Sequence, residues 1–165
     1  MIDPRASGGE KLTPPHPLPY VSRKALKRVT DWIEPPEQCP NCGSPVELVN
    51  NSEIYGREYG DWPYAYRCFD HKGCDSYVGL HPNTDLPLGT LADSFERQAR
   101  KDNKHHFMTW QELNGWSRKQ IYAWLAQRMG IPVSQCHWGL FGVEQANLAG
   151  AICEEATEKM METSL

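Results

Sequence analysis

The spacing of apolar residues changes along the chain, and after about residue 91 it fits helices. Apolar side chains recur there every three or four positions, which is the period of one helix face. We expect a helix from a Thr90 N-cap to about His105, whose inward face comprises Leu91, Ala92, Phe95 and Ala99. One further helical turn is expected over 109–113, before the Asn114-Gly115 pair.

Two more helices are expected in the C-terminal part of the chain. Ser117 and Gln120 have the spacing of a capping box, in which each side chain pairs with the other residue's backbone N–H. The helix that they open ends at Gly130 and Pro132, which are typical helix-terminating residues. The apolar pattern predicts a last helix from Val143 to about Met161.

Between Cys39 and about Leu91 the pattern changes to short strands separated by turn residues. Four segments are rich in aromatic or β-branched residues and are bounded by Gly, Asn, Asp and Pro, which is typical of strands. These segments are 46–49, 53–59, 64–69 and 76–80. The expected fold class is therefore α+β, with a small region of short antiparallel strands followed by a helical C-terminal half.

The N-terminal part differs from both of these regions. Residues 1–21 contain a Ser-Gly-Gly stretch, one proline near the start and four prolines between positions 14 and 19. This composition predicts a flexible Pro-rich arm. Residues 22–36 predict a short basic amphipathic helix that begins at a Ser22 N-cap and stops at the Pro35-Pro36 pair. The remaining parts are the strand region, 37–91, and the helical region, 92–165.

Composition indicates that the core needs support from another source. Leu, Ile, Val and Phe make up 18% of the 165 residues, below the roughly 20% at which disorder becomes a concern. Six cysteines offer that support. The N-terminus has no apolar stretch that could act as a signal peptide, and no apolar run approaches the roughly 20 residues of a membrane span. We therefore expect a cytoplasmic protein without a membrane partner, whose cysteines bind metal rather than form disulfides.

Four of the cysteines have the spacing of a zinc site. Cys39 and Cys42 are separated by two residues and followed by a glycine, and Cys68 and Cys74 follow about 25 residues later. A tetrahedral structural zinc takes four such ligands, whereas a catalytic zinc keeps an open position. We expect one structural Zn²⁺ on Cys39, Cys42, Cys68 and Cys74, in a zinc ribbon over 37–91.

The identity of the fourth ligand has an alternative. His71 lies between Cys68 and Cys74 and could replace Cys74, which would give three sulfurs and one nitrogen. We favour Cys74, because the charged residues around His71 suit an exposed loop tip. Cys74 leads directly into the predicted strand 76–80, so a ligand there would anchor the sheet.

Several motifs resemble a known family. Segments CPNCGS (39–44), IYGREYG (54–60), YVGLH (77–81) and PLGTLA (87–92) are similar to the small zinc-finger-containing family of phage and bacterial proteins. The later segments 117–126 and 137–141 also resemble it, so the resemblance covers about 39–150. It implies a metal site and a phage or mobile-element setting, and hence the cytoplasm of a host cell. The knuckles alone are more weakly similar to the zinc ribbons of type I topoisomerases.

The second knuckle departs from that family's pattern. The family has two residues between the cysteines of this knuckle, whereas five residues separate Cys68 from Cys74 in this chain. This difference leaves His71 open as the fourth ligand, because two residues separate Cys68 from His71, as in the family.

Charge is distributed in blocks of alternating sign. The net charge is +4 over 1–30, −7 over 31–91, +3 over 92–130 and −4 over 131–165. Zinc on four thiolates adds about −2 to the ribbon, and phosphate contacts dominate nucleic-acid affinity. We therefore expect nucleic acid to contact the helical region rather than the ribbon. The candidate contact residues are Arg97, Arg100, Lys101, Lys104, Arg118 and Lys119.

The ribbon also contains a group of aromatic residues with two interpretations. They could form the small core that a ribbon needs, or they could stack on unpaired bases. The core interpretation is the one we favour. The residues are Tyr55, Tyr59, Trp62, Tyr64 and Tyr66.

Sequence motifs for catalysis are missing. The chain has no HExxH, no phosphate-binding GxxxxGK[ST], no GxSxG and no GxGxxG motif. Cys136 and Cys153 are interpreted as buried free thiols. We expect a non-enzymatic, zinc-stapled binding protein that contacts nucleic acid through basic helices. The alternative is a protein-binding module that docks on a host nucleic-acid-processing protein through acidic surfaces and inhibits or redirects it.

Overall fold

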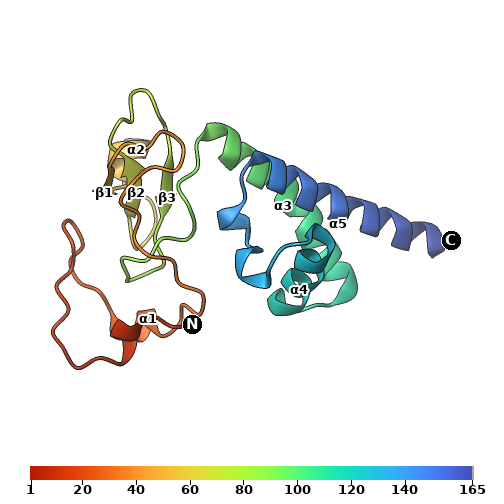
Figure 1. The fold of residues 1–165 in the computed structure, drawn as a ribbon, viewed down its shortest axis with the longest axis horizontal. Helices are drawn as coiled ribbons and strands as arrows, with labels where there is room; N and C mark the ends of the chain where they lie inside the picture. The colour runs from red at the N-terminus through yellow and green to blue at the C-terminus, as the bar shows by residue number, and fades with distance from the viewer. Residues whose placement is uncertain (165) are drawn as a thin grey trace. The chain divides into compact units, whose positions relative to one another are not determined.

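The structure, a computed structural model, describes residues 1–164 and separates into two compact units. The first unit is Met1–Asp93 and contains a small sheet, and the second begins at Ser94 and is helical (Figure 1). The expected α+β class is confirmed, with short antiparallel strands preceding a set of helices. No helix of the described residues is long and apolar enough to cross a membrane.

The sheet of the first unit has three antiparallel strands in the order β1-β2-β3. They are β1 (Val46–Asn50), β2 (Tyr64–Cys68) and β3 (Tyr77–Gly79). Val46 lies opposite Cys68, and Tyr66 lies opposite Val78. The central strand therefore ends at a cysteine that faces the start of its neighbour.

The prediction of a strand over 53–59 is wrong. The chain forms a single helical turn there, α2 (Ser52–Tyr55), which ends at Gly56 with φ of 84°. The reason lies in Asn51, whose side-chain amide donates to the Tyr59 carbonyl at 3.0 Å and accepts from the Tyr59 N–H at 3.1 Å. These two bonds close the connection from β1 to β2 as a compact loop, so the segment cannot extend as a strand.

The N-terminal residues differ from the expected flexible arm, because they pack into the core of the first unit. A 3-10 turn, η1 (Pro4–Ser7), opens this segment. Ala6, Leu18 and Val21 are buried together with Tyr66 and Leu86 of the ribbon. The first 21 residues are thus part of the fold.

The basic helix expected over 22–36 is much shorter in the structure. Ser22 caps it as expected, accepting from the Ala25 N–H, but α1 spans only Arg23–Leu26. The chain turns after Leu26, which lets both Leu26 and Val29 enter the same core as the ribbon.

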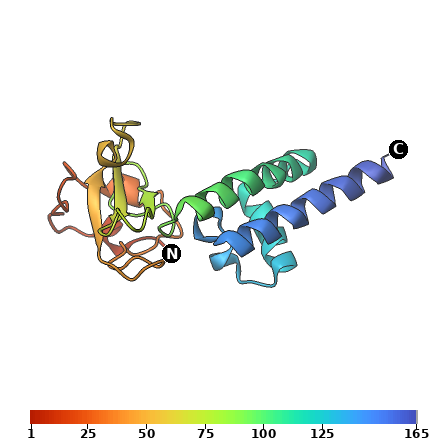
Figure 2. The same ribbon diagram turned by 90° about the horizontal axis from the view of Figure 1, so that it is seen from above.

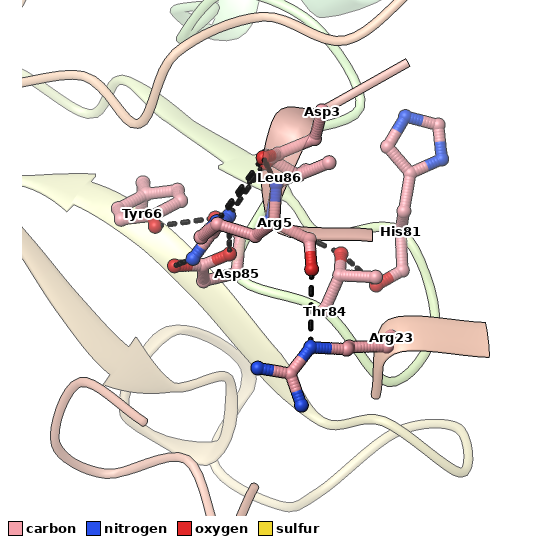
Figure 3. Close-up of polar contacts among 8 residues, drawn as sticks. All are labelled: Asp3, Arg5, Arg23, Tyr66, His81, Thr84, Asp85 and Leu86. Atoms are coloured by element: carbon pink, nitrogen blue, oxygen red, sulfur yellow. Dashed lines mark hydrogen bonds and ion pairs between the residues drawn. The ribbon is translucent and has the colours of Figure 1, made fainter. Parts of the chain in front are cut away.

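A partly buried polar cluster ties the N-terminal segment to the ribbon (Figure 3). The Arg5 guanidinium lies between two carboxylates, and its Nη2 is 2.7 Å from both Asp3 Oδ2 and Asp85 Oδ1. The Arg23 Nε donates to the Arg5 carbonyl, and the Tyr66 hydroxyl donates to the Asp85 carbonyl. Burial opposes ionisation of Asp3, but the hydrogen bonds and charge of Arg5 hold its pKa below the usual value.

The second unit is built from three helices, and the first and last of them lie side by side (Figures 1 and 2). They are α3 (Ser94–Asn114), α4 (Arg118–Met129) and α5 (Val143–Thr163). Asn103 contacts Asn147, and His106 lies near Glu154, so α3 and α5 run in the same direction. Two parallel neighbours need a long return connection, which α4 and the 3-10 turns η2 (Val133–Gln135) and η3 (Trp138–Leu140) provide.

The start of α3 differs from the expectation. Thr90 is not its N-cap, because the Ala92 N–H and carbonyl pair with Tyr77 at 3.1 and 3.2 Å and hold 90–93 against β3. The helix therefore begins at Ser94, continues without a break through 109–113, and leaves Phe95 77% exposed instead of inward.

The other two helices are as expected. Ser117 and Gln120 form the capping box of α4, and Gly130 ends the helix with φ of 70°. Helix α5 begins at Val143, although Val143 itself is exposed. A Cβ at Gly150 would collide with the Asn103 side chain, so this glycine lets α3 and α5 approach closely.

Candidate metal centre

Four cysteine side chains converge at one end of the sheet. The Sγ atoms of Cys39, Cys42, Cys68 and Cys74 all lie within 4.8 Å of one another. Cys39 and Cys74 are 3.8 Å apart at sulfur, and Cys42 and Cys68 are 3.4 Å apart. A tetrahedral zinc with Zn–S bonds of about 2.3 Å separates its sulfurs by about 3.8 Å. The four thiols therefore fit one zinc ion.

The first knuckle is a tight turn closed by backbone hydrogen bonds. The Gly43 N–H donates to the Cys39 carbonyl, and the Cys39 N–H donates to the Ser44 carbonyl, both at 2.8 Å. Gly43 has φ of 78°, in the left-handed region that favours glycine. This turn brings Cys42 back beside Cys39.

The second knuckle begins at the last residue of β2. Cys68 is held there by its N–H, which donates to the Ser76 carbonyl at 2.9 Å, and the Cys74 N–H donates to the Asp70 carbonyl at 2.8 Å. The longer gap of five residues is thus curled into a turn that still delivers both sulfurs. His71 lies on this turn with its side chain exposed and outside the cluster.

Sequence reasoning missed two side chains that support the ligands. Asn41 Nδ2 donates to Ser76 Oγ at 2.8 Å, and Ser76 Oγ lies 3.3 Å from the sulfur of Cys74. Ser76 is completely buried. These contacts connect the two knuckles and orient one ligand, a role that neighbouring groups commonly have at metal sites. The only sequence signal was their position inside and directly after the knuckles.

The four thiols lie in different environments. Hydrogen bonds from Ser44 lower the pKa of the exposed Cys42, whereas burial raises the pKa of Cys68. A metal cation offsets the cost of ionising a buried thiol, because it binds the thiolate directly. The arrangement suits a closed structural site, with every tetrahedral position taken by sulfur.

All six candidate nucleic-acid residues lie in the helical unit, on two helices. Lys101 and Lys104 of α3 are exposed, and Arg118 and Lys119 are exposed in the first turn of α4. Arg97 and Arg100 are half-buried, and Arg100 Nε donates to the Phe141 carbonyl at 2.7 Å. Arg100 therefore fixes the loop before α5 in place, a role that the sequence did not reveal.

The ribbon aromatics divide between the two interpretations. Tyr66 is buried, and Trp62 and Tyr64 pack against the same core. Tyr55 and Tyr59 are close to half-exposed, with ring centroids 5.3 Å apart. The core interpretation thus holds for three of the five rings.

The two remaining cysteines are buried thiols, as expected. Cys136 and Cys153 both belong to the core of the helical unit, and no disulfide joins any of the six cysteines, all of which lie within the described residues. Burial raises the pKa of Cys136 to about 11 and that of Cys153 to about 12.

A small antiparallel sheet with four cysteines at zinc-binding distances defines a zinc-ribbon protein, with one structural zinc. The chain belongs to a family described as a zinc-finger-containing domain, whose model matches residues 35–156. The match includes both knuckles and most of the helical unit, and it begins after the N-terminal segment. No curated protein and no solved structure matches the chain.

Proposed function

We propose that the protein is a non-enzymatic binding protein whose helical unit contacts nucleic acid. The metal centre supports the first part of this proposal, because a zinc with four thiolate ligands has no open position for substrate or water. The zinc then serves the fold, and binding falls to the surfaces of the two units.

The observation that carries the proposal is the distribution of charge in the helical unit. No acidic residue occurs between Glu112 and Glu144, a stretch that includes all of α4 and three cations, Arg118, Lys119 and Arg128. Exposed Lys101 and Lys104 on α3 add to this positive charge. Cationic surfaces bind nucleic acid because neutralising phosphates releases counterions. The ribbon, with its net charge of −7 over 31–91, is unsuited to that contact.

Retention of the zinc-loaded full chain on labelled DNA across a salt series tests the proposal. The double variant Lys101→Glu/Lys104→Glu reverses two exposed cations of α3. Lys24→Glu/Lys27→Glu makes the same change of charge at exposed positions of the first unit and serves as the matched control. We expect the α3 variant to lose retention and show a shallower salt dependence, while the control retains both. Equal effects of the two variants would contradict the proposal.

A second candidate function is supported by the charge of α5. Four glutamates lie along its C-terminal half, and all of them are exposed: Glu154, Glu155, Glu158 and Glu162. These glutamates, or separately the acidic ribbon, could face a basic surface of a partner protein, such as a host nucleic-acid-processing protein. This candidate predicts that the chain binds no DNA, and that it competes with DNA for the partner's basic surface.

A further inference from the structure

Helix α4 exposes one polar face that no other element of its unit covers. Lys119, Ala123 and Gln127 are exposed and follow one another at intervals of four residues, so they share a face. Ile121 and Leu125 lie on the opposite side and are buried in the core, and Ala126 is buried beside Gln127 near the end of the helix. The buried face fixes the helix to the unit, and the exposed face is free to meet a partner.

The chemistry of this face fits the edges of DNA bases. A lysine pairs with the acceptors of guanine, and a glutamine side chain pairs in two places with adenine in the major groove. The small Ala123 between them allows the helix to approach closely. An α-helix is about 10–12 Å across with side chains, which matches the roughly 12 Å width of the major groove.

The first turn of α4 presents a cation beside this face. Arg118 Nη2 donates to His137 Nε2 at 2.7 Å, a contact that orients the guanidinium. The guanidinium has further N–H donors that a phosphate oxygen can accept from. Arg118 stands in the exposed first turn, where positive helix-dipole charge adds to its own.

Duplex DNA fits this face better than other nucleic acids. Single strands bind to exposed aromatic rings, but Trp124 of α4 is packed against Trp110 and Trp116 and lies beneath Arg128. The major groove of duplex RNA is too narrow for side chains to enter. The whole stretch from 113 to 143, which includes α4, contributes no acidic residue that would repel a polyanion.

We propose that α4 enters the major groove of duplex DNA, with Lys119, Ala123 and Gln127 facing the bases and Arg118 contacting a backbone phosphate. This inference rests on the proposed function and names its partner and its contact surface.

The test compares two exposed alanines on different helices in the zinc-loaded full chain. Ala123→Glu places a bulky negative side chain on the α4 face, and Ala151→Glu makes the same change on the exposed side of α5. Glutamate is a good helix former, so both variants should fold. Binding to a labelled 20-base-pair duplex, to its single strand and to a duplex RNA is followed by fluorescence anisotropy. A random duplex library reports sequence preference for the wild type and for Gln127→Ala.

We expect Ala123→Glu to weaken duplex DNA binding by at least about tenfold, while Ala151→Glu stays within about twofold. We also expect Gln127→Ala to change the selected sequence at one position. If Ala123→Glu and Gln127→Ala leave DNA affinity and preference unchanged while the α3 charge reversal abolishes binding, this inference is wrong and the proposed function stands. If the wild type binds the single strand or duplex RNA more tightly than duplex DNA, the inference is likewise overturned. Failure of the wild type to bind any nucleic acid would overturn both.

Discussion

The two units of this chain reach a stable fold by different means. The ribbon unit has strands of five, five and three residues, and long irregular connections join them. The helical unit has helices of 21, 12 and 21 residues. Helices satisfy most of their backbone hydrogen bonds internally, whereas short strands depend on contacts between distant segments.

The cores of the two units show the same difference. The core of the helical unit is built around aromatic and aliphatic side chains such as Phe107, Trp138, Phe141 and Leu125. The core of the ribbon includes two of the metal ligands themselves, Cys39 and Cys68. A zinc ion can supply folding energy that a small apolar core lacks. We therefore expect the fold of the ribbon unit to depend on the metal and the fold of the helical unit to be independent of it.

Removal of zinc should have the largest effect, because it should unfold one unit and leave the other folded. Structural zinc contributes on the order of 10 kcal/mol in small domains, so a chelator should unfold the ribbon unit. The long helices lie in the other unit, so most of the helical circular dichroism signal should persist. Restoring zinc should recover protease resistance of the first 93 residues. Loss of the helical signal in the same step as the zinc would contradict the division into two kinds of unit.

The reciprocal change is a large core truncation in the helical unit. Phe141 is completely buried and packs against the ring of Trp138, and Phe141→Ala should cost about 3–5 kcal/mol of unfolding free energy. Thermal denaturation followed by circular dichroism measures the loss. The zinc content should stay at the wild-type level, and a variant that also released zinc would show that the units depend on one another.

Removing the N-terminal tie should have a smaller effect, confined to the ribbon. Arg5→Ala leaves the buried carboxylates of Asp3 and Asp85 without their partner, which should cost about 1–3 kcal/mol. At neutral pH Asp3 is ionised, because its pKa is held low, so the full effect is present there. Lys11→Ala, at an exposed position of the same segment, is the control. Equal stabilities of the two variants in denaturant would indicate that the segment is not tied to the ribbon.

Thiol reactivity distinguishes the four metal-binding cysteines of the ribbon from the two buried cysteines of the helical unit. The native zinc protein should react slowly at all six positions near neutral pH. A chelator should expose the four ribbon thiols alone. Cys136 and Cys153 should stay unreactive below about pH 10 unless the helical unit unfolds, because they are buried and their pKa values are raised to about 11 and 12. Rapid reaction of six thiols after chelation would contradict this.

The features that the sequence predicted correctly are those with local causes. The capping box of Ser117 and Gln120 lies within four residues, and it placed the start of α4. The cysteine spacing identified the metal ligands, because knuckles are short turns. Position and charge of the residues around His71 were enough to favour Cys74 as a ligand.

The features that the sequence did not predict depend on distant contacts. The N-terminal segment is ordered by Arg5 and Asp85, which are 80 positions apart. The prediction of Thr90 as an N-cap was wrong because Ala92 pairs with Tyr77 of the sheet. The prediction of a strand over 53–59 was wrong because Asn51 closes a loop to Tyr59. In each of these cases a contact outside the local window overrode the local pattern.

X-ray absorption at the zinc edge of the purified full chain reports the ligands of the metal. We conclude that one zinc on four cysteine sulfurs holds the ribbon unit together, with His71 in solvent. We predict one zinc per chain, four sulfur scatterers at about 2.3 Å and no nitrogen in the first shell, with the same spectrum in His71→Ala. A nitrogen scatterer that disappears in His71→Ala, or a protein that retains no zinc, would contradict the claim.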